Sequence, residues 1–276
     1  MTKGKTITTY LIDGHPNGIR TCFISNKICK AVVVPRAKLM GAKKRSELHQ
    51  PALYILMSDS DDKMYIGETE DFLSRIRDHE TKKSFWEQAI IFVSKDNDLT
   101  KSDVKYLEYL AIKQAQETAR YNIDENKTSP KPTSLPEHQL AFIEEFFEDV
   151  CTLATFLGVP VFETVKQKNQ KLFYHCRKSV TATGFYSESG FTVLKGAMIP
   201  IQSSPVFVGK KKRDEKLKLN SIMVDKETVK LERDLTFKSP SAAASFCYGK
   251  ASNGWSDWVN DTGQTLDEVY RNTTEI

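Results

Sequence analysis

Two short stretches decide the fold: Leu53-Tyr54-Ile55 and Tyr65-Ile66-Gly67, with the two tyrosines 11 residues apart. Both stretches are apolar and β-prone, and the segment Asp59-Ser60-Asp61-Asp62 between them is typical of a turn. We therefore expect an antiparallel hairpin of residues 52–57 and 64–66. If Met57 pairs with Met64, then Tyr54 lies opposite Gly67, and both tyrosines face one side of the sheet because side chains alternate along a strand.

The residues that follow predict two helices and a further strand. A helix is expected over residues 71–81, with Arg75 and His79 one turn apart on the same side. Residues 89–94 read as a short buried strand. Thr100 then caps a second helix, with Asp103 in the capping-box position. Glu108 lies within the apolar stripe of this helix, where a carboxylate is costly unless it pairs with a metal or with a cation such as Arg75.

These side chains have the chemistry that phosphodiester hydrolysis requires. Glu108 can ligate a hard ion such as Mg²⁺ or Mn²⁺, and Arg75 can clamp a phosphate with its planar donors. Tyr54 or Tyr65 can orient or deprotonate water, provided that positive charge lowers a phenol pKa that is ordinarily about 10. His79 can position the phosphate or relay a proton. Each residue taken alone fits an ordinary structural role equally well, so their joint spacing carries the prediction.

Together these motifs resemble the GIY-YIG nuclease family over about residues 52–122. The resemblance departs from the family at Ala52, where a glycine is usual. It implies an α+β domain with a three-stranded antiparallel sheet flanked by helices, and metal-dependent cleavage of DNA at one Mg²⁺ or Mn²⁺ ion. The implied roles are active-site phenols for Tyr54 and Tyr65 (with the general base unassigned between them), phosphate binding for Arg75 and His79, metal binding for Glu108, and structural support for Gly67 and Asn122.

Composition and charge outline four segments. Residues 1–50 form a basic N-terminal β extension, residues 51–128 the nuclease domain, residues 129–160 a linker and connecting helix, and residues 161–276 a C-terminal α+β domain for DNA recognition or interaction. Lys and Arg outnumber Asp and Glu ten to two in residues 1–50, whereas residues 51–128 have eleven basic and sixteen acidic residues. The basic cluster Arg36, Lys38, Lys43, Lys44 and Arg45 is a candidate for phosphate contacts, with a solvated basic surface as the alternative.

The C-terminal segment offers two further resemblances. Residues 237–244 and the triplet Asn253-Gly254-Trp255 resemble an uncharacterised C-terminal domain of a bacterial GIY-YIG subfamily. They also resemble a RAMA-type module, from a family proposed to read modified DNA. The alanines of residues 242–244 fit a helix that packs closely on a sheet, and the basic run of residues 210–213 reads as a solvated loop.

The remaining features are those of an ordinary soluble protein. No apolar run reaches 18 residues, and the first residues lack the apolar centre of a signal peptide, so a cytoplasmic protein without a membrane span is expected. The five cysteines are scattered and suggest neither zinc nor disulfides. We therefore predict a metal-dependent DNA endonuclease. The alternatives are a non-catalytic nucleic-acid-binding protein with the same fold, and a scaffold whose C-terminal domain binds a protein.

Overall fold

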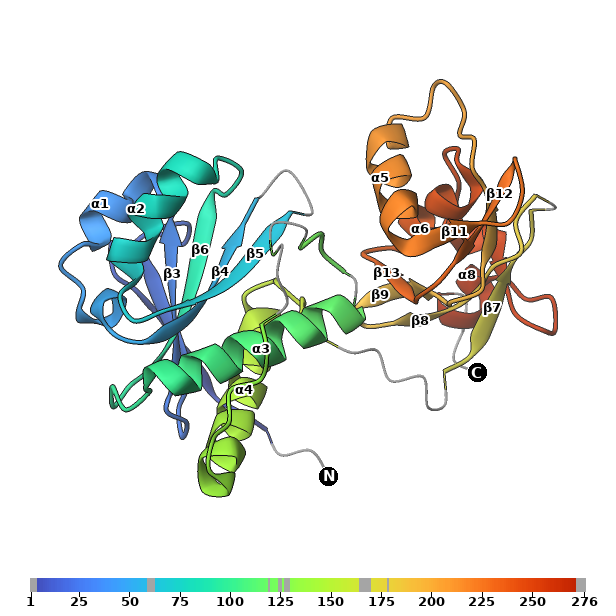
Figure 1. The fold of residues 1–276 in the computed structure, drawn as a ribbon. Helices are drawn as coiled ribbons and strands as arrows, with labels where there is room; N and C mark the ends of the chain where they lie inside the picture. Colours follow the sequence, from blue (N-terminus) through green and yellow to red (C-terminus); the bar gives the residue numbers. More distant parts are fainter. Residues whose placement is uncertain are drawn as a thin grey trace. The chain divides into compact units, whose positions relative to one another are not determined.

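The computed structural model describes residues 4–58, 63–118, 120–123, 126, 130–163, 170–177 and 179–271, with only the backbone at residues 78–82. The chain divides into two compact units: Met1–Glu117 with Tyr121–Glu163, and Thr118–Arg120 with Thr164–Ile276. Each unit combines helices with antiparallel strands (Figure 1), so the predicted α+β class is confirmed. The turn expected at residues 59–62 lies outside the described residues.

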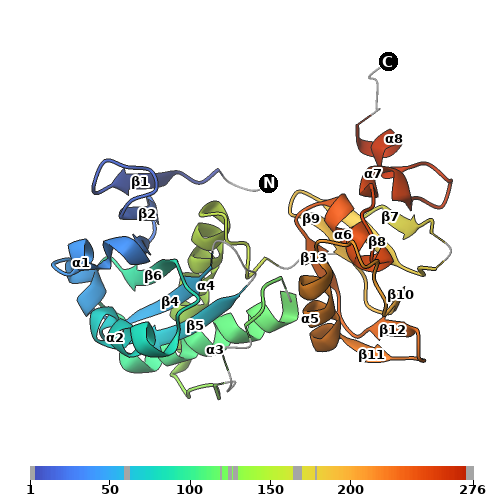
Figure 2. The same cartoon turned by 90° about the horizontal axis from the view of Figure 1, so that it is seen from above.

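The first unit is built on one sheet of six antiparallel strands in the order β1-β2-β3-β6-β4-β5. The strands are β1 (Ile7–Leu11), β2 (Arg20–Ile24), β3 (Cys29–Pro35), β4 (Ala52–Met57), β5 (Met64–Thr69) and β6 (Gln88–Ser94). The three strands implied by the resemblance are β6, β4 and β5. The N-terminal strands continue the same sheet because β3 pairs with β6 from Cys29↔Ser94 to Pro35↔Gln88. Figure 2 shows β1 and β5 as opposite edges of this sheet.

One face of this sheet is covered by short helical segments and by α2. They are η1 (Arg36–Lys38), α1 (Leu39–Ala42), η2 (Ser46–His49) and α2 (Phe72–Lys82). Phe72 and Ile76 of α2, together with Leu48, pack against Tyr54 and Leu56 of β4 in one buried cluster. Because side chains alternate along a strand, Leu53 and Ile55 face the opposite layer. The predicted helix at residues 71–81 is thus confirmed, and its apolar side seats it on the Tyr54 face.

The opposite face is covered by α3 (Lys101–Thr118) and α4 (Glu137–Phe156). The predicted capping box of α3 is confirmed, since the Asp103 carboxylate accepts the Thr100 backbone N–H at 2.8 Å. The helix expected to connect the domains is instead part of the first unit. Its buried residues, among them Phe146 and Val150, belong to the same core as the sheet. It begins at Glu137 after Pro136 without a side-chain cap.

The second unit contains two small antiparallel sheets. One has the order β13-β9-β8-β7-β14 and the other β10-β12-β11. Their strands are β7 (Leu172–His175), β8 (Thr183–Ser187), β9 (Gly190–Val193), β10 (Met198–Pro200), β11 (Ser221–Met223), β12 (Thr228–Leu231), β13 (Leu235–Phe237) and β14 (Trp258–Val259). The helices of this unit are α5 (Lys210–Asn220), α6 (Pro240–Tyr248), α7 (Gly254–Asp257) and α8 (Leu266–Tyr270).

Helix α6 is the predicted small-residue helix. The Ser239 hydroxyl accepts the Ala242 backbone N–H at 3.2 Å, and Gly249 ends the helix with a φ of 69°. Ala243 and Ala244 are buried in the core of the unit, as close packing on a sheet requires. Trp258 is also fully buried and stacks on Phe191 with ring centroids 4.3 Å apart, which makes it a core residue.

The prediction of a solvated loop at residues 210–213 is wrong, because this basic run forms the first turn of α5. Arg213 is only 3% exposed and donates to the backbone carbonyl of Phe246 at 2.7 Å and to that of Ile201 at 2.9 Å. The guanidinium therefore provides hydrogen-bond donors for backbone carbonyls of distant residues, and the local sequence does not reveal these partners. Across the described part of the chain, no helix is long and apolar enough to cross a membrane.

Candidate active site

Tyr54 and Tyr65 meet on one face of the β4–β5 hairpin. The register predicted from sequence is confirmed: Met57 pairs with Met64, Tyr54 with Gly67, and Leu56 with Tyr65. Tyr54 is fully buried, whereas Tyr65 is half-buried, and their ring centroids are 6.0 Å apart. The Tyr54 ring also meets the edge of Phe72 at 5.4 Å. The hairpin therefore presents one enclosed phenol and one more accessible phenol side by side.

Gly67 leaves the room in which the two phenols meet. A Cβ at this position would lie 2.5 Å from the Tyr54 Oη, 2.6 Å from its Cζ and 2.8 Å from the Tyr65 Cε1. Real Cβ atoms essentially never approach other heavy atoms so closely. The glycine is thus required by close approach, which is a specific form of the supporting role that the resemblance implied.

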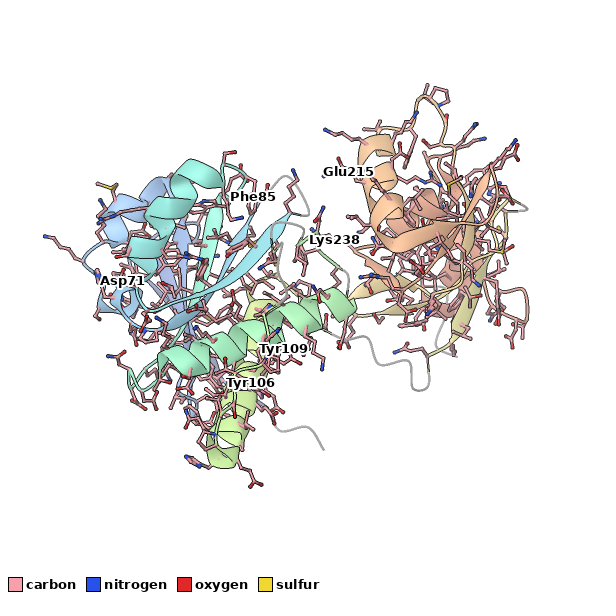
Figure 3. All side chains as sticks on the ribbon, in the orientation of Figure 1. Asp71, Phe85, Tyr106, Tyr109, Glu215 and Lys238 are labelled. Atoms are coloured by element: carbon pink, nitrogen blue, oxygen red, sulfur yellow. The ribbon has the colours of Figure 1, made fainter. Side chains whose placement is uncertain are left out.

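Helix α2 brings Arg75 to the same phenols. Asp71 precedes the helix, and its carboxylate accepts the Ser74 backbone N–H at 2.8 Å. Figure 3 labels Asp71, which precedes α2 in the sequence, and Phe85, which follows it. One turn further on, the Arg75 side chain is exposed and hydrogen-bonds to the Tyr54 phenol. This bond raises the pKa of Arg75, whose guanidinium is charged at neutral pH.

The environment of Tyr54 favours the protonated phenol. Burial, reinforced by the neighbouring Tyr65, raises the pKa of Tyr54 well above its usual value. The hydrogen bond from Arg75 opposes this effect but does not outweigh it. Positive charge also lies beside Tyr65, because the Lys83 Nζ is 4.3 Å from the centroid of that ring. Lys83 was not among the predicted site residues, since it comes after the helix that carries Arg75.

Glu108 lies on α3, half-buried and close to the outer edge of β5. Burial, reinforced by repulsion from Glu68, raises the pKa of Glu108 to about 7. A hydrogen bond from the Glu68 backbone N–H and the charges of Arg75 and Lys105 act in the opposite direction. Arg75 is thus near enough to attract Glu108, while its own hydrogen bonds go to Tyr54 and Tyr65. The alternative of an Arg75–Glu108 pair therefore does not account for the site as a whole.

The outer edge of β5 explains how Glu108 comes to this position. As an edge strand, β5 directs the N–H groups of alternate residues away from β4. The Met64 N–H donates to the Asn122 carbonyl at 2.9 Å, and the Ile66 N–H donates to the Asn126 Oδ1 at 3.1 Å. The next outward N–H, of Glu68, is the one that reaches Glu108. One strand edge thus lines up the segment after α3 and the candidate metal ligand.

Asn126 was missed by sequence reasoning. Its side-chain amide bonds to both backbone groups of Ile66, accepting the N–H and donating to the carbonyl at 2.6 Å. The amide replaces a neighbouring strand at that point. Asn122, which the resemblance singled out, contacts β5 through its backbone carbonyl and forms an isolated parallel bridge with Lys63. The only sequence signal for Asn126 is an amide shortly after the last motif, which is too common to be informative.

The members of the predicted basic cluster differ in whether they have partners within the unit. Arg36 donates to the backbone carbonyls of Ser84 and Trp86 at 3.0 and 3.2 Å, and its guanidinium lies 4.8 Å from the centroid of the Trp86 ring. Lys38 pairs with Asp13 at 2.5 Å. These two cations are thus engaged within the unit.

Of the remaining members of the basic cluster, one is ion-paired and two are exposed. Arg45 pairs with the buried Glu47 at 2.6 Å, which also accepts Lys30 at 3.4 Å. Lys43 and Lys44 are exposed. The side chain of His79 lies outside the described residues, so its place in the site stays a prediction.

The donor set fits a hard divalent ion held partly by solvent. Glu108 and Glu68 are neighbouring carboxylates, and carboxylate oxygens are the ligands that Mg²⁺ and Mn²⁺ prefer. Among the described residues, no group of three or more His, Cys, Asp or Glu side chains is gathered that could hold a metal by protein ligands alone. An ion bound here would therefore retain water and phosphate oxygens as its remaining ligands, which is common for Mg²⁺.

Comparison with known families agrees with this geometry. Residues 50–122 match the family model described as the GIY-YIG catalytic domain, so the chain contains a GIY-YIG domain. More particularly, residues 172–270 match a domain of unknown function, DUF4357, so that a GIY-YIG domain and a C-terminal DUF4357 domain are combined in one chain. No curated protein and no solved structure gave a match.

Proposed function

We propose that this protein is a metal-dependent DNA endonuclease whose active site consists of Tyr54, Tyr65, Arg75 and Glu108. The observation that supports it most is the convergence of these groups at one strand edge. Two phenols in ring contact, a guanidinium that hydrogen-bonds to both of them, and a half-buried carboxylate whose pKa is about 7 come together there. This combination of anion-binding, proton-handling and cation-binding groups is what phosphodiester hydrolysis needs.

Arg75 is the phosphate-binding group in this proposal. Its guanidinium is exposed and charged, and the hydrogen bond to Tyr54 holds it in place. A planar fork of N–H donors can then bind two non-bridging phosphate oxygens and stabilise the charge that develops on them. Tyr54 holds the guanidinium from behind, as a neutral phenol, and does not need to lose its proton. His79, one turn after Arg75, is proposed to assist on the same phosphate.

Tyr65 is the better placed phenol for a role that requires contact with water. It is half-buried, whereas Tyr54 is fully buried, and it has the Lys83 cation beside its ring. Tyr65 is therefore proposed to orient the attacking water. The pKa of Tyr54, which burial raises, makes that residue a poor general base near neutral pH.

Glu108 would hold the divalent ion through its carboxylate. When bound, such an ion neutralises charge on the phosphate and stabilises the leaving oxygen. The chain's own contribution is to place the carboxylate: α3 carries it, and the outward backbone N–H of Glu68 orients it. Lys43 and Lys44 are exposed and are proposed to contact DNA phosphates, whereas Arg36, Lys38 and Arg45 have partners within the unit.

Plasmid cleavage tests the proposal. Supercoiled DNA is incubated with the full chain and Mg²⁺ or Mn²⁺, with and without EDTA, and nicked and linear products are measured. We expect metal-dependent cutting that Glu108→Gln abolishes. Glu117→Gln is the matched control, because Glu117 is exposed on the same helix. Equal cutting by the Glu108→Gln variant would contradict the proposal, and salt-dependent DNA binding without any cutting would favour a non-catalytic binding protein instead.

A further inference from the structure

Glu68 follows directly on the Tyr65-Ile66-Gly67 triplet and lies beside Glu108. It pairs with Leu53 in the β4–β5 ladder, and Leu53 faces the layer that contains α3. Because side chains alternate, the Glu68 carboxylate leaves the strand on the α3 side, opposite to Tyr65 and Gly67. Val104 and Leu107 of α3 are buried against this side of the sheet, and Glu108 is the next residue along.

The backbone fixes the two carboxyl groups relative to each other. The backbone N–H of Glu68 acts on the Glu108 carboxylate and lowers its pKa, and this N–H points away from β4 toward the outer edge of β5, so the two residues are neighbours at that edge. The Glu68 side chain branches from the adjacent Cα. Two groups of the same charge are therefore held together at the edge of β5, one of them half-buried, and their mutual repulsion is unfavourable unless a cation lies between them.

Nearby lysines do not cancel this charge. Lys101 forms an ion pair with Glu70 at 2.6 Å, and that pair is exposed. Glu68 attracts Lys101 only at longer range, and Lys105 acts on Glu108 in the same way. No ion pair within 4.0 Å joins Glu68 or Glu108 to any side chain that the structure describes. Both carboxylates thus have oxygen ligands to offer.

We propose that Glu68 supplies a second carboxylate to the divalent ion of Glu108, so that residues from β5 and α3 hold the ion together. This inference deepens the proposed function and rests on it. Mg²⁺ and Mn²⁺ sites often use one or two carboxylates plus water and phosphate. A second carboxylate increases affinity for the ion before DNA binds, and it ties the ion to the strand that carries Tyr65.

Binding of Mn²⁺ to the full chain, measured by the loss of its free-ion electron paramagnetic resonance signal, tests the inference without reference to cleavage. At pH 8 we expect Glu68→Gln to raise the dissociation constant for Mn²⁺ by roughly tenfold or more. Glu108→Gln should raise it at least as much. Glu70→Gln is the matched control, because it removes an exposed carboxylate two residues after Glu68, just beyond the end of β5. It should leave the dissociation constant for Mn²⁺ unchanged.

Glu68→Asp keeps the charge and guards against misfolding, since its dissociation constant should fall between those of the parent and Glu68→Gln. Circular dichroism of each variant reports on the fold. Parent-like binding of Mn²⁺ by Glu68→Gln, with loss of binding in Glu108→Gln, would overturn the role of Glu68 and leave the proposed function standing. Parent-like binding in both variants would overturn the role of Glu68 and the metal site of the proposed function together.

Discussion

Replacing Gly67 by alanine probes the packing on which the candidate site depends. The new Cβ would lie 2.5 Å from the Tyr54 Oη and 2.8 Å from the Tyr65 Cε1. An ordinary contact of about 3.4 Å thus requires the Tyr54 Oη to move by about 0.9 Å. Tyr54 has little freedom to do so, because it is fully buried, meets Phe72 edge-on and is bonded to Arg75.

The size of the effect follows from this crowding. Overpacking of a buried site typically costs about 1–3 kcal/mol, and each kcal/mol lowers the melting temperature of a domain of this size by roughly 2–4 °C. A displacement near 1 Å among catalytic groups can also reduce the cleavage rate about 100-fold. We therefore expect Gly67→Ala to be both less stable and nearly inactive.

Thermal unfolding followed by circular dichroism and plasmid cleavage measure the two effects. Gly41→Ala is the control, because a Cβ at Gly41 in α1 meets only the Ile19 Cδ1, at 3.9 Å. That variant should be as stable as the parent or slightly more stable. If Gly67→Ala melts within about 1 °C of the parent and cuts DNA at the parent rate, the packing argument is refuted.

Three further predictions concern charge and hydrogen bonding. Because the proposed metal ligand Glu108 would bind an ion as the carboxylate, we expect cleavage at limiting Mn²⁺ to rise as pH increases through about 7. Its folded pKa exceeds the ordinary 4.5, so the folded protein loses stability as pH rises from about 4.5 to about 7, and Glu108→Gln should raise the melting temperature at pH 8 but not at pH 4. A flat rate profile, or equal shifts at both pH values, would contradict this. Arg75→Ala should lower the cleavage rate by about 10²–10³-fold, whereas Arg77→Ala, an exposed change on the same helix, should be neutral; equal losses in a plasmid assay would remove Arg75 from the site. Asn126→Ala should cost about 1–3 kcal/mol and speed amide exchange at Ile66 in hydrogen-exchange mass spectrometry, and unchanged exchange would show that the amide does not close the strand edge.

The parts of this structure that sequence could predict are those decided by nearby residues. The alternation in β4 and β5 set the register that brings Tyr54 opposite Gly67. The capping box at Thr100 and Asp103 marked the start of α3 from residues three apart. In each case the signal spans a few residues, so local pattern and tertiary structure agree.

What the sequence did not reveal depends on partners far along the chain. The N-terminal strands join the sheet only because β3 pairs with β6, about 60 residues away. Arg213 is buried by carbonyls at Ile201 and Phe246, so a charged run gave no sign of its own burial. Asn126 contacts Ile66 across 60 residues in the same way. Within the site, the proximity of Glu68 to Glu108 likewise depends on how α3 lies along β5, which no local spacing specifies.

The saturated outer edge of β5 also has a consequence for assembly. A bare strand edge is a template on which another chain can add a strand, as peptide ligands and growing fibrils do. Here Asn122, Asn126 and Glu108 occupy successive outward amides of β5. A second molecule would have to displace all three before it could continue the sheet on this side. The groups that lie along the candidate site therefore also keep a neighbouring molecule from pairing with β5.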